Sequence, residues 1–207
     1  MTATDHFLHA DDIRTGTRMT EQEFESWALA TRARAEWVNG EVVIMAPANA
    51  DHWEISSWLV ALMAMYASKH KLGKAGGPEL MNRFEGERRV PDVLFIKKDN
   101  LPRLKRTYIE GGADLIVEVV SPDSVRRDWR DKYLTYQRAG VPEYWIIDPN
   151  TSIAEFYHLH DGKYQPIEIT DGILRSVQLA GFWLKVEWLW QRPLPEPYDI
   201  AHIIGIH

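Results

Sequence analysis

Two carboxylates lie inside apolar, strand-like stretches of this chain. Asp92 follows a proline at the head of the apolar run 93–96, and Glu118 interrupts the run 115–120. An ionised carboxylate buried without a partner is costly in free energy, so each of these acids needs a partner. A hard divalent cation is the partner that two convergent carboxylates suit best. The pattern therefore predicts a cation site at which Asp92 and Glu118 meet.

A lysine follows the second acid on a predicted helix. Lys132 and Asp128 lie four residues apart in a stretch that favours a helix over about residues 125–139, so they share one face. Metal-assisted hydrolysis of a phosphodiester needs a bound cation, an activated water and a positive group facing the developing charge. Lys132 would position or deprotonate the water, or steady the pentavalent phosphate, and Asp128 would orient Lys132. The backbone carbonyl of Val119 or Val120 would add a metal ligand.

The charge of the chain is unevenly distributed. The formal net charge is −6, which argues against a protein that binds polyanions over its whole surface. Residues 83–106 nevertheless carry eight basic and four acidic side chains, and residues 126–138 carry five basic and two acidic ones. Positive charge beside an acidic metal site is what a phosphodiester substrate requires. The plainer alternative is that these arginines and lysines only solvate helix faces.

Composition narrows the class of protein. With 207 residues, 45% of them hydrophobic and 26% charged, the chain fits one soluble domain with a short appendage. The lack of cysteine excludes a disulfide framework, a thiolate zinc site and a thiol nucleophile. No apolar run reaches the length of a membrane span, and residues 1–6 lack the layout of a signal peptide. We therefore expect a cytoplasmic protein with no membrane partner.

The N-terminal part predicts a helix, a hairpin and a long helix in that order. Residues 20–23, Thr-Glu-Gln-Glu, form a capping box that starts a helix ending near Thr31. A hairpin over residues 35–45 turns at Asn39-Gly40, the dipeptide that suits a two-residue loop. An amphipathic helix follows over about residues 51–71, because its apolar positions recur with helical spacing.

The remainder predicts mainly strands. The run 115–120 is apolar apart from its glutamate, which favours a central strand covered on both faces. A polar, basic connection is expected over residues 100–112. The other expected elements are strands at 79–84, 90–97, 143–147 and 174–179, a second hairpin of 153–158 with 163–169, and a Trp-rich closing element at 182–190. We expect a lead-in at 1–18, one domain at 19–190, and a tail at 191–207 that packs on the surface or on a second subunit.

The order of four segments resembles the Uma2 family of bacterial endonucleases, within the PD-(D/E)XK or restriction-endonuclease-like superfamily. These segments are Pro91-Asp92, Glu118-Val119-Val120-Ser121-Pro122, Asp128 with Lys132, and Gly140-Val141-Pro142-Glu143-Tyr144-Trp145-Ile146-Ile147-Asp148-Pro149. The likeness takes in Glu36 and His52 and spans about residues 20–189. In the superfamily a lysine normally stands two residues after the second acid, where this chain has Val120. Lys132 instead matches the lysine that Uma2 proteins carry on the following helix.

The resemblance implies a fold, a metal and a partner. The implied fold is α/β (α+β), a restriction-endonuclease-like mixed β-sheet flanked by helices, with an N-terminal helix–hairpin and a C-terminal β-hairpin extension. Asp92, Glu118 and Lys132 are the implied catalytic residues, and Asp92, Glu118 and Val119 would hold Mg²⁺ or Mn²⁺. DNA is the implied substrate, and homodimers are common in the family.

Three further side chains are candidates for the site. Glu36 faces inward from the first hairpin and would be an additional ligand or a water-mediated contact. His52 starts the long helix and would approach the site, although a histidine at a helix start is more often structural. Tyr136 continues the helix face of Asp128 and Lys132, and it either reaches the site or packs in the core.

Three functions remain open at this point. The favoured one is a Mg²⁺-dependent DNA endonuclease, because both acid positions and the lysine position are occupied. The second is a catalytically silent nuclease-fold domain that binds nucleic acid or a protein partner. The third takes Asp92 and Glu118 as the carboxylate pair of a glycosidase, which needs neither a metal nor a lysine.

Overall fold

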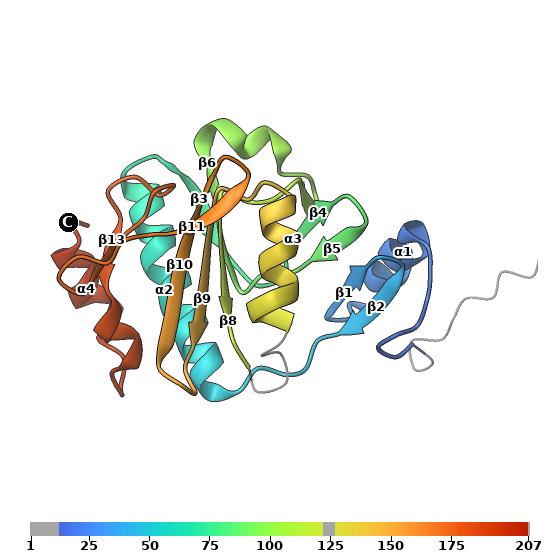
Figure 1. The fold of residues 1–207 in the computed structure, drawn as a ribbon, viewed down its shortest axis with the longest axis horizontal. Coiled ribbons are helices and arrows are strands. Elements are labelled where there is room, and N and C mark those ends of the chain that lie inside the picture. The colour runs from blue at the N-terminus through green and yellow to red at the C-terminus, as the bar shows by residue number, and fades with distance from the viewer. Residues whose placement is uncertain (1–12, 122–126, 207) are drawn as a thin grey trace, which may run out of the picture.

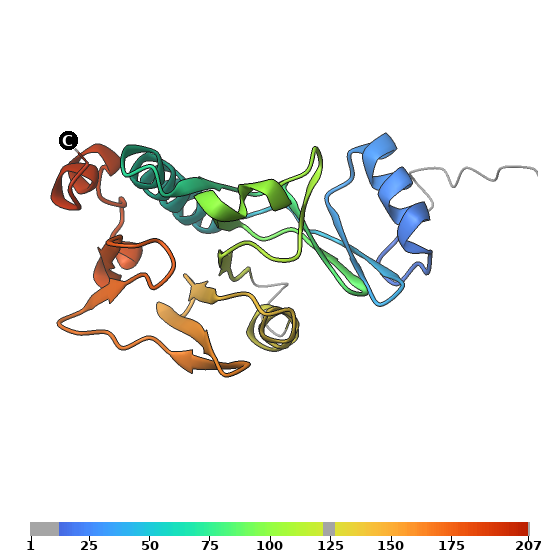
Figure 2. The same cartoon turned by 90° about the horizontal axis from the view of Figure 1, so that it is seen from above.

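The N-terminal helix and hairpin lie at one end of an elongated molecule, and the C-terminal helix lies at the other (Figures 1 and 2). The computed structural model describes residues 13–121 and 127–206, except for the side chains of residues 127 and 128. The sequence also predicts capping side chains at Ser121-Pro122-Asp123-Ser124; residues 122–124 of this segment and the expected helix start at Val125 lie outside the described residues. Within the described part of the chain, no helix has the length and apolar character needed to cross a bilayer.

A six-stranded mixed sheet forms the body, in the order β11-β10-β9-β8-β6-β3. Its strands are β3 (Gly73–Gly76), β6 (Val93–Lys97), β8 (Leu115–Val119), β9 (Glu143–Asp148), β10 (Ile153–His160) and β11 (Lys163–Pro166). Strands β8 and β9 run parallel, and the other neighbours are antiparallel. The prediction of a central, fully covered strand is confirmed, since every residue of β8 is buried.

Helices cover both faces of this sheet (Figure 1). The helical elements are α1 (Glu21–Thr31), α2 (Ala50–Lys69), the 3-10 helix η2 (Lys98–Arg103), the π-helical turn η3 (Arg127–Lys132), α3 (Tyr133–Arg138), the 3-10 helix η4 (Val186–Trp190) and α4 (Pro197–Ile203). Side chains alternate along a strand, so Val117 packs in the core with α2 while Ile116 packs in the core with α3. By the same alternation Glu118 points toward the helical segment that carries Lys132.

A second sheet lies at the N-terminal end, in the order β2-β1-β5-β4-β7. Its strands are β1 (Ala35–Val38), β2 (Glu41–Ile44), β4 (Met81–Phe84), β5 (Glu87–Arg89) and β7 (Tyr108–Glu110). The predicted hairpin forms as expected, and the predicted capping box is present at Thr20 and Glu23. A third, two-stranded sheet pairs β12 (Ile173–Arg175) with β13 (Trp183–Lys185) near the C-terminus.

The two large sheets join at Val90-Pro91-Asp92. The sequence predicted one strand over residues 90–97, but β5 ends at Arg89 and β6 begins at Val93. Pro91 has no N–H to offer a ladder, so strand pairing breaks at this point. The chain leaves one sheet here and enters the other, and Asp92 therefore stands at their junction.

Other segments also differ from the prediction. Strand β3 was missed because Gly-Lys-Ala-Gly shows no apolar alternation, yet glycine at 73 lets the backbone of β6 approach closely. The segment predicted as a polar connection, residues 100–112, contains the end of η2 and all of β7. Strands β4, β11 and β12 are shorter than predicted. The tail packs on this chain's own core, where Ile200 and Ala201 of α4 lie buried beside α2.

Candidate active site

Asp92 is held at the sheet junction through one carboxylate oxygen. Its Oδ2 accepts the backbone N–H of Val119 at 2.8 Å and lies 3.1 Å from Nε2 of His52. No described residue donates a hydrogen bond to its Oδ1. A Cβ at Gly77 would collide with the carbonyl oxygen of Asp92, so glycine at 77 is what allows this backbone approach. The carboxylate is thus fixed in place with one oxygen left to bind something else.

Glu118 forms a buried ion pair with the predicted lysine. Nζ of Lys132 lies 2.7 Å from Oε2 of Glu118, and the hydroxyl of Tyr136 donates to Oε1 at 2.6 Å. Burial, followed by the charge of Glu118, holds the pKa of Tyr136 well above its ordinary value. Tyr136 therefore stays protonated and remains a hydrogen-bond donor to the carboxylate. One turn of helix thus supplies both the lysine and the tyrosine that contact Glu118.

Glu36 reaches the same lysine from the other sheet. Its Oε1 lies 3.8 Å from Nζ of Lys132 and accepts the backbone N–H of Val90 at 3.1 Å. Its Oε2 accepts a hydrogen bond from Arg89 at 3.0 Å. Burial alone would raise the pKa of Glu36, but the charges of Lys132 and Arg89 and the amide of Val90 outweigh it, so the pKa lies below its ordinary value. Glu36 is therefore a carboxylate anion beside the lysine.

Arg89 is a buried residue that the sequence analysis did not single out. Its guanidinium bridges Glu36 to Glu87, with Nε 2.7 Å from an oxygen of Glu87. Glu87 in turn accepts hydrogen bonds from Thr135 and Arg138, which follow Lys132 along the helix. Burial would lower the pKa of Arg89, but Glu36 and Glu87 outweigh that effect and raise it. The one local signal is its position in a charged strand directly before Pro91-Asp92.

His52 contacts the site from the first turn of α2. Its backbone N–H donates to the side chain of Asn49, which caps the helix, and its Nε2 lies against Asp92. Its Nδ1 is buried and has no hydrogen-bond partner among the described residues. Helix α2 thus places the side chain of His52 at the sheet junction, beside Asp92.

A small cavity of about 30 Å³ opens at this junction. It is lined by Arg34, Met45, Ala46, Pro47, Ala48, His52, Asp92, Val119, Ser121 and Lys132. A cavity of this size has room for a water or a single ion. Three of the predicted site side chains therefore meet around one small polar space.

The donors at the junction fit a hard divalent cation. Mg²⁺ is commonly bound through one or two carboxylates, with waters and substrate phosphate completing its shell. Asp92 offers an oxygen that no described residue occupies, and Glu118 lies on the neighbouring strand β8. The described residues hold no group of three or more histidine, cysteine, aspartate or glutamate side chains placed to bind a metal. The residues therefore fit a two-carboxylate site and not a closed protein cage.

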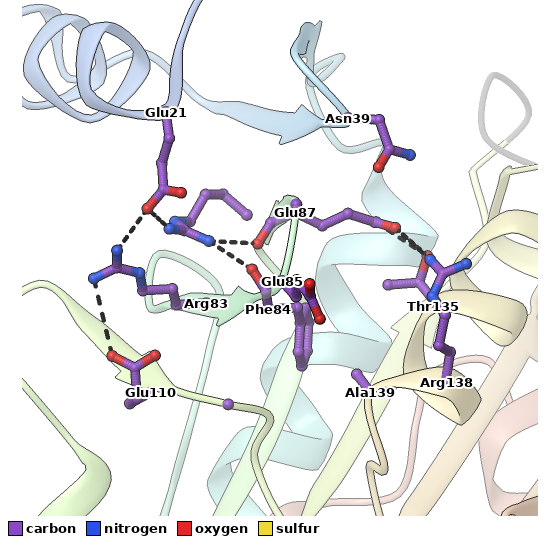
Figure 3. A pocket seen from close by; sticks show the side chains of 13 residues that line it. Glu21, Asn39, Arg83, Phe84, Glu85, Glu87, Glu110, Thr135, Arg138 and Ala139 are labelled. Atoms are coloured by element: carbon purple, nitrogen blue, oxygen red, sulfur yellow. Dashed lines mark hydrogen bonds and ion pairs between the residues drawn. The ribbon is translucent and has the colours of Figure 1, made fainter.

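A larger cleft of about 910 Å³ lies beyond Arg89. Figure 3 shows Arg83 between Glu21 and Glu110, and Glu87 directed toward Thr135 and Arg138. The charged side chains that line the cleft thus pair largely with each other. Asp92, Glu118 and Lys132 do not line it. The candidate active site is therefore the small cavity, which Glu87 and Arg89 connect to this cleft.

The structure brings together most of the side chains that the sequence singled out. Glu36 and Glu118 lie beside Lys132, Tyr136 contacts Glu118, and His52 contacts Asp92. The two sets adjoin because His52, Asp92 and Lys132 line the same cavity. Val119 contributes its backbone N–H to Asp92, and the role predicted for its carbonyl stays a prediction. The side chain of Asp128 lies outside the described residues, so its predicted role also stays a prediction.

Comparisons with known proteins identify a family and a similar fold. The profile of the Uma2 family, described as "Putative restriction endonuclease", matches residues 21–187. A similar solved structure is that of "a putative nuclease belonging to DUF820" from Anabaena variabilis ATCC 29413, with a TM-score of 0.70 and 20% sequence identity. The alignment covers 83% of this chain and 97% of that one, and at this identity it shows the fold. No functionally curated protein matches.

Proposed function

This chain belongs to the Uma2 family of restriction-endonuclease-like proteins, and we propose that it is a Mg²⁺- or Mn²⁺-dependent endonuclease that hydrolyses DNA by metal-activated water. One observation carries the proposal. Asp92 and Lys132 line the same small cavity, and Lys132 is paired with Glu118. Two metal-ligand candidates and a cation thus lie at or beside this cavity, which is the set that such a hydrolysis requires.

Asp92 and Glu118 would hold the metal, with Val119 as a candidate backbone ligand. The oxygen Oδ1 of Asp92 is available without breaking a hydrogen bond to any described residue, whereas both oxygens of Glu118 are engaged by Lys132 and Tyr136. A bound Mg²⁺ would polarise the phosphate and lower the pKa of a coordinated water. Tyr136 restrains the carboxylate of Glu118 through its hydrogen bond to Oε1.

The placement of Lys132 favours one of its predicted roles. Its ammonium lies between Glu118, at 2.7 Å, and Glu36, at 3.8 Å. Two neighbouring carboxylates favour the cationic form of a lysine. We therefore assign Lys132 the role of a positive charge that faces the phosphate as negative charge develops, in preference to that of a base that deprotonates the water.

Calorimetric titration with Mg²⁺ and Mn²⁺ tests the metal site without a guess about the substrate. We expect saturable binding by the wild type and its loss in Asp92→Asn and Glu118→Gln. Asp114→Asn is the matched control, because Asp114 is also a buried carboxylate, but it accepts hydrogen bonds from the backbone of Lys97 and from Asn100. Equal binding by all four proteins would place the metal elsewhere and overturn the assignment.

Cleavage assays then test the reaction itself. Plasmid and oligonucleotide DNA are incubated with wild type, Asp92→Asn and Asp114→Asn in Mg²⁺ or Mn²⁺. The proposal expects cleavage by the wild type and by Asp114→Asn, with loss of cleavage in Asp92→Asn and in the presence of a chelator. Cleavage that survives both the chelator and the Asp92 substitution would contradict a metal-dependent mechanism at this site.

A second candidate function is supported by a specific observation. Both oxygens of Glu118 are engaged by protein groups, and the described residues hold no group of three or more acids or histidines placed to bind a metal. A nuclease-fold domain that binds nucleic acid or a protein partner without cutting would need no metal. Metal-independent DNA binding without cleavage would favour it. Family membership speaks against the glycosidase hypothesis.

Assembly is proposed from the family resemblance, and location from the cysteine-free composition. We propose that the protein forms a homodimer and acts in the cytoplasm. Light scattering coupled to size exclusion would measure the mass of the particle, for which a monomer has 24.0 kDa. A monomeric mass at micromolar concentration would contradict the proposed dimer.

A further inference from the structure

Arg34 is an exposed arginine whose backbone is fixed by the first hairpin. Its carbonyl accepts the N–H of Met45 at 2.9 Å, which extends the β1–β2 ladder by one pair beyond Ala35 and Ile44. Residues two apart on a strand project from the same face. Arg34 therefore leaves the hairpin on the face of Glu36, which contacts Lys132. The hairpin thus presents a second charged side chain toward the candidate site.

The side chain of Arg34 lies at the small cavity described above. It lines that cavity together with Asp92 and Lys132, and it is exposed to solvent. Among the described residues it has no ion-pair partner. Neighbouring arginines differ in this respect, because Arg88 and Arg89 are buried in ion pairs with glutamates. Arg34 is therefore a cation at the cavity that no described acidic residue neutralises.

The charges around the sheet junction bear on what the guanidinium of Arg34 binds. Asp92, Glu118 and Glu36 are buried acids, and in their contacts with described residues Lys132 and Arg89 supply the fixed positive charges. These described charges, three acids against two cations of which Arg89 is shared with Glu87, repel a phosphate in the absence of a metal. A guanidinium at the mouth offsets this repulsion, and its planar fork can donate two hydrogen bonds to phosphate oxygens.

Resting on the proposed nuclease function, we propose that Arg34 forms a phosphate subsite for the nucleic-acid substrate. Its guanidinium binds non-bridging oxygens of a backbone phosphate at the cavity mouth. Binding there places the sugar–phosphate chain across Asp92 and Lys132. The contact is to phosphate and not to a base, so it contributes to affinity equally for all sequences.

The salt dependence of DNA binding tests this subsite. Wild type, Arg34→Gln and Arg34→Lys are titrated with fluorescent duplex and single-stranded oligonucleotides of mixed sequence, in Ca²⁺ to suppress cleavage, at salt from about 50 to about 200 mM. Loss of one phosphate contact lowers the slope of log K against log salt by about 0.7–0.9. We expect that loss, with weaker binding, in Arg34→Gln. Arg34→Lys should retain the slope, because the charge remains.

Arg32→Gln is the matched control. Arg32 is two residues away, also exposed and of equal charge, but it does not line the cavity. Its substitution should leave the slope unchanged. Equal slopes for wild type and Arg34→Gln, or equal losses in Arg34→Gln and Arg32→Gln, would overturn the subsite while the nuclease proposal stands. Failure of the wild type to bind DNA at any salt would overturn both. Calorimetric metal binding by Arg34→Gln checks that the site is intact.

Discussion

Nζ of Lys132 lies 2.7 Å from Oε2 of Glu118, and both side chains are almost wholly buried. The pair links the helix that covers one face of the main sheet to the central strand of that sheet. Glu36 adds a second carboxylate 3.8 Å from the same ammonium and comes from the other sheet. Three separate elements of the fold thus meet at Lys132. Its substitution should change the unfolding free energy and the cleavage rate by different amounts.

Lys132→Met should abolish most of the cleavage activity and also destabilise the protein. Loss of a single charge that faces the transition state typically lowers the rate by about 10²–10³-fold. Removal of one partner of a buried ion pair costs about 3–5 kcal/mol of unfolding free energy. Urea unfolding and single-turnover cleavage measure the two effects. Lys132→Met combined with Glu36→Gln should recover part of the stability but none of the activity, whereas recovered activity would refute the assigned role.

Arg89→Met should destabilise the fold more than an exposed arginine substitution does. It leaves Glu36 and Glu87 as buried anions that have lost a shared partner, which costs about 3–5 kcal/mol. Arg89→Lys should recover only part of this, because one ammonium cannot match the fork that spans both acids. Urea unfolding measures each variant, with Arg18→Met, an exposed partner of Glu41, as the control. Equal effects of the Arg89 and Arg18 substitutions would argue against a structural bridge.

Gly77→Ala should disturb Asp92 through the backbone. The added Cβ would meet the carbonyl oxygen of Asp92, and the strain should cost about 1–3 kcal/mol and weaken metal binding. Gly76 is the adjacent control, because a Cβ there meets nothing within 4 Å. Gly76→Ala should change the unfolding free energy by less than about 1 kcal/mol. Thermal unfolding and metal calorimetry compare the two, and identical behaviour would show that the close approach does not constrain Asp92.

Glu143 should make stability depend on pH. Burial raises its pKa to about 7 from 4.5, although Trp145, Ser176 and the N–H of Gln178 donate hydrogen bonds to it. Between these two pH values the native state binds more protons than the unfolded state, so the unfolding free energy falls as pH rises. Its contribution is complete below about pH 4.5 and is lost above about pH 7, a change of up to about 3 kcal/mol.

Glu143→Gln should flatten that part of the pH profile. The amide does not titrate, so the fall in unfolding free energy between about pH 4.5 and pH 7 should be smaller than in the wild type. Its overall stability should also be lower, because an amide nitrogen cannot accept the bonds that the second oxygen accepts. Urea unfolding over a pH series measures both. A slope that is the same in both proteins would assign the pH dependence to another group.

The sequence by itself determined the types of residue at the site and the elements that carry them. An acid in an apolar run, a proline before Asp92 and an Asn-Gly turn are local signals, and each sets local structure through backbone sterics or burial cost. They were enough to predict the central strand and the first hairpin, and they singled out Asp92, Glu118 and Lys132 as candidates for one site. The same local rules missed β3, because its glycine-rich sequence shows no apolar alternation and it is a strand only through its pairing with β6.

Only the tertiary structure decided which charges pair. Glu36 and Arg89 are 53 residues apart and meet because β1 lies beside β5 in the second sheet. The chain has 30 acidic and 24 basic residues, so composition permits very many such pairs. Sheet pairing and burial select one set, and the same packing leaves Arg34 exposed at the cavity. Long-range contact of this kind depends on strand order and register, which no short stretch of sequence encodes.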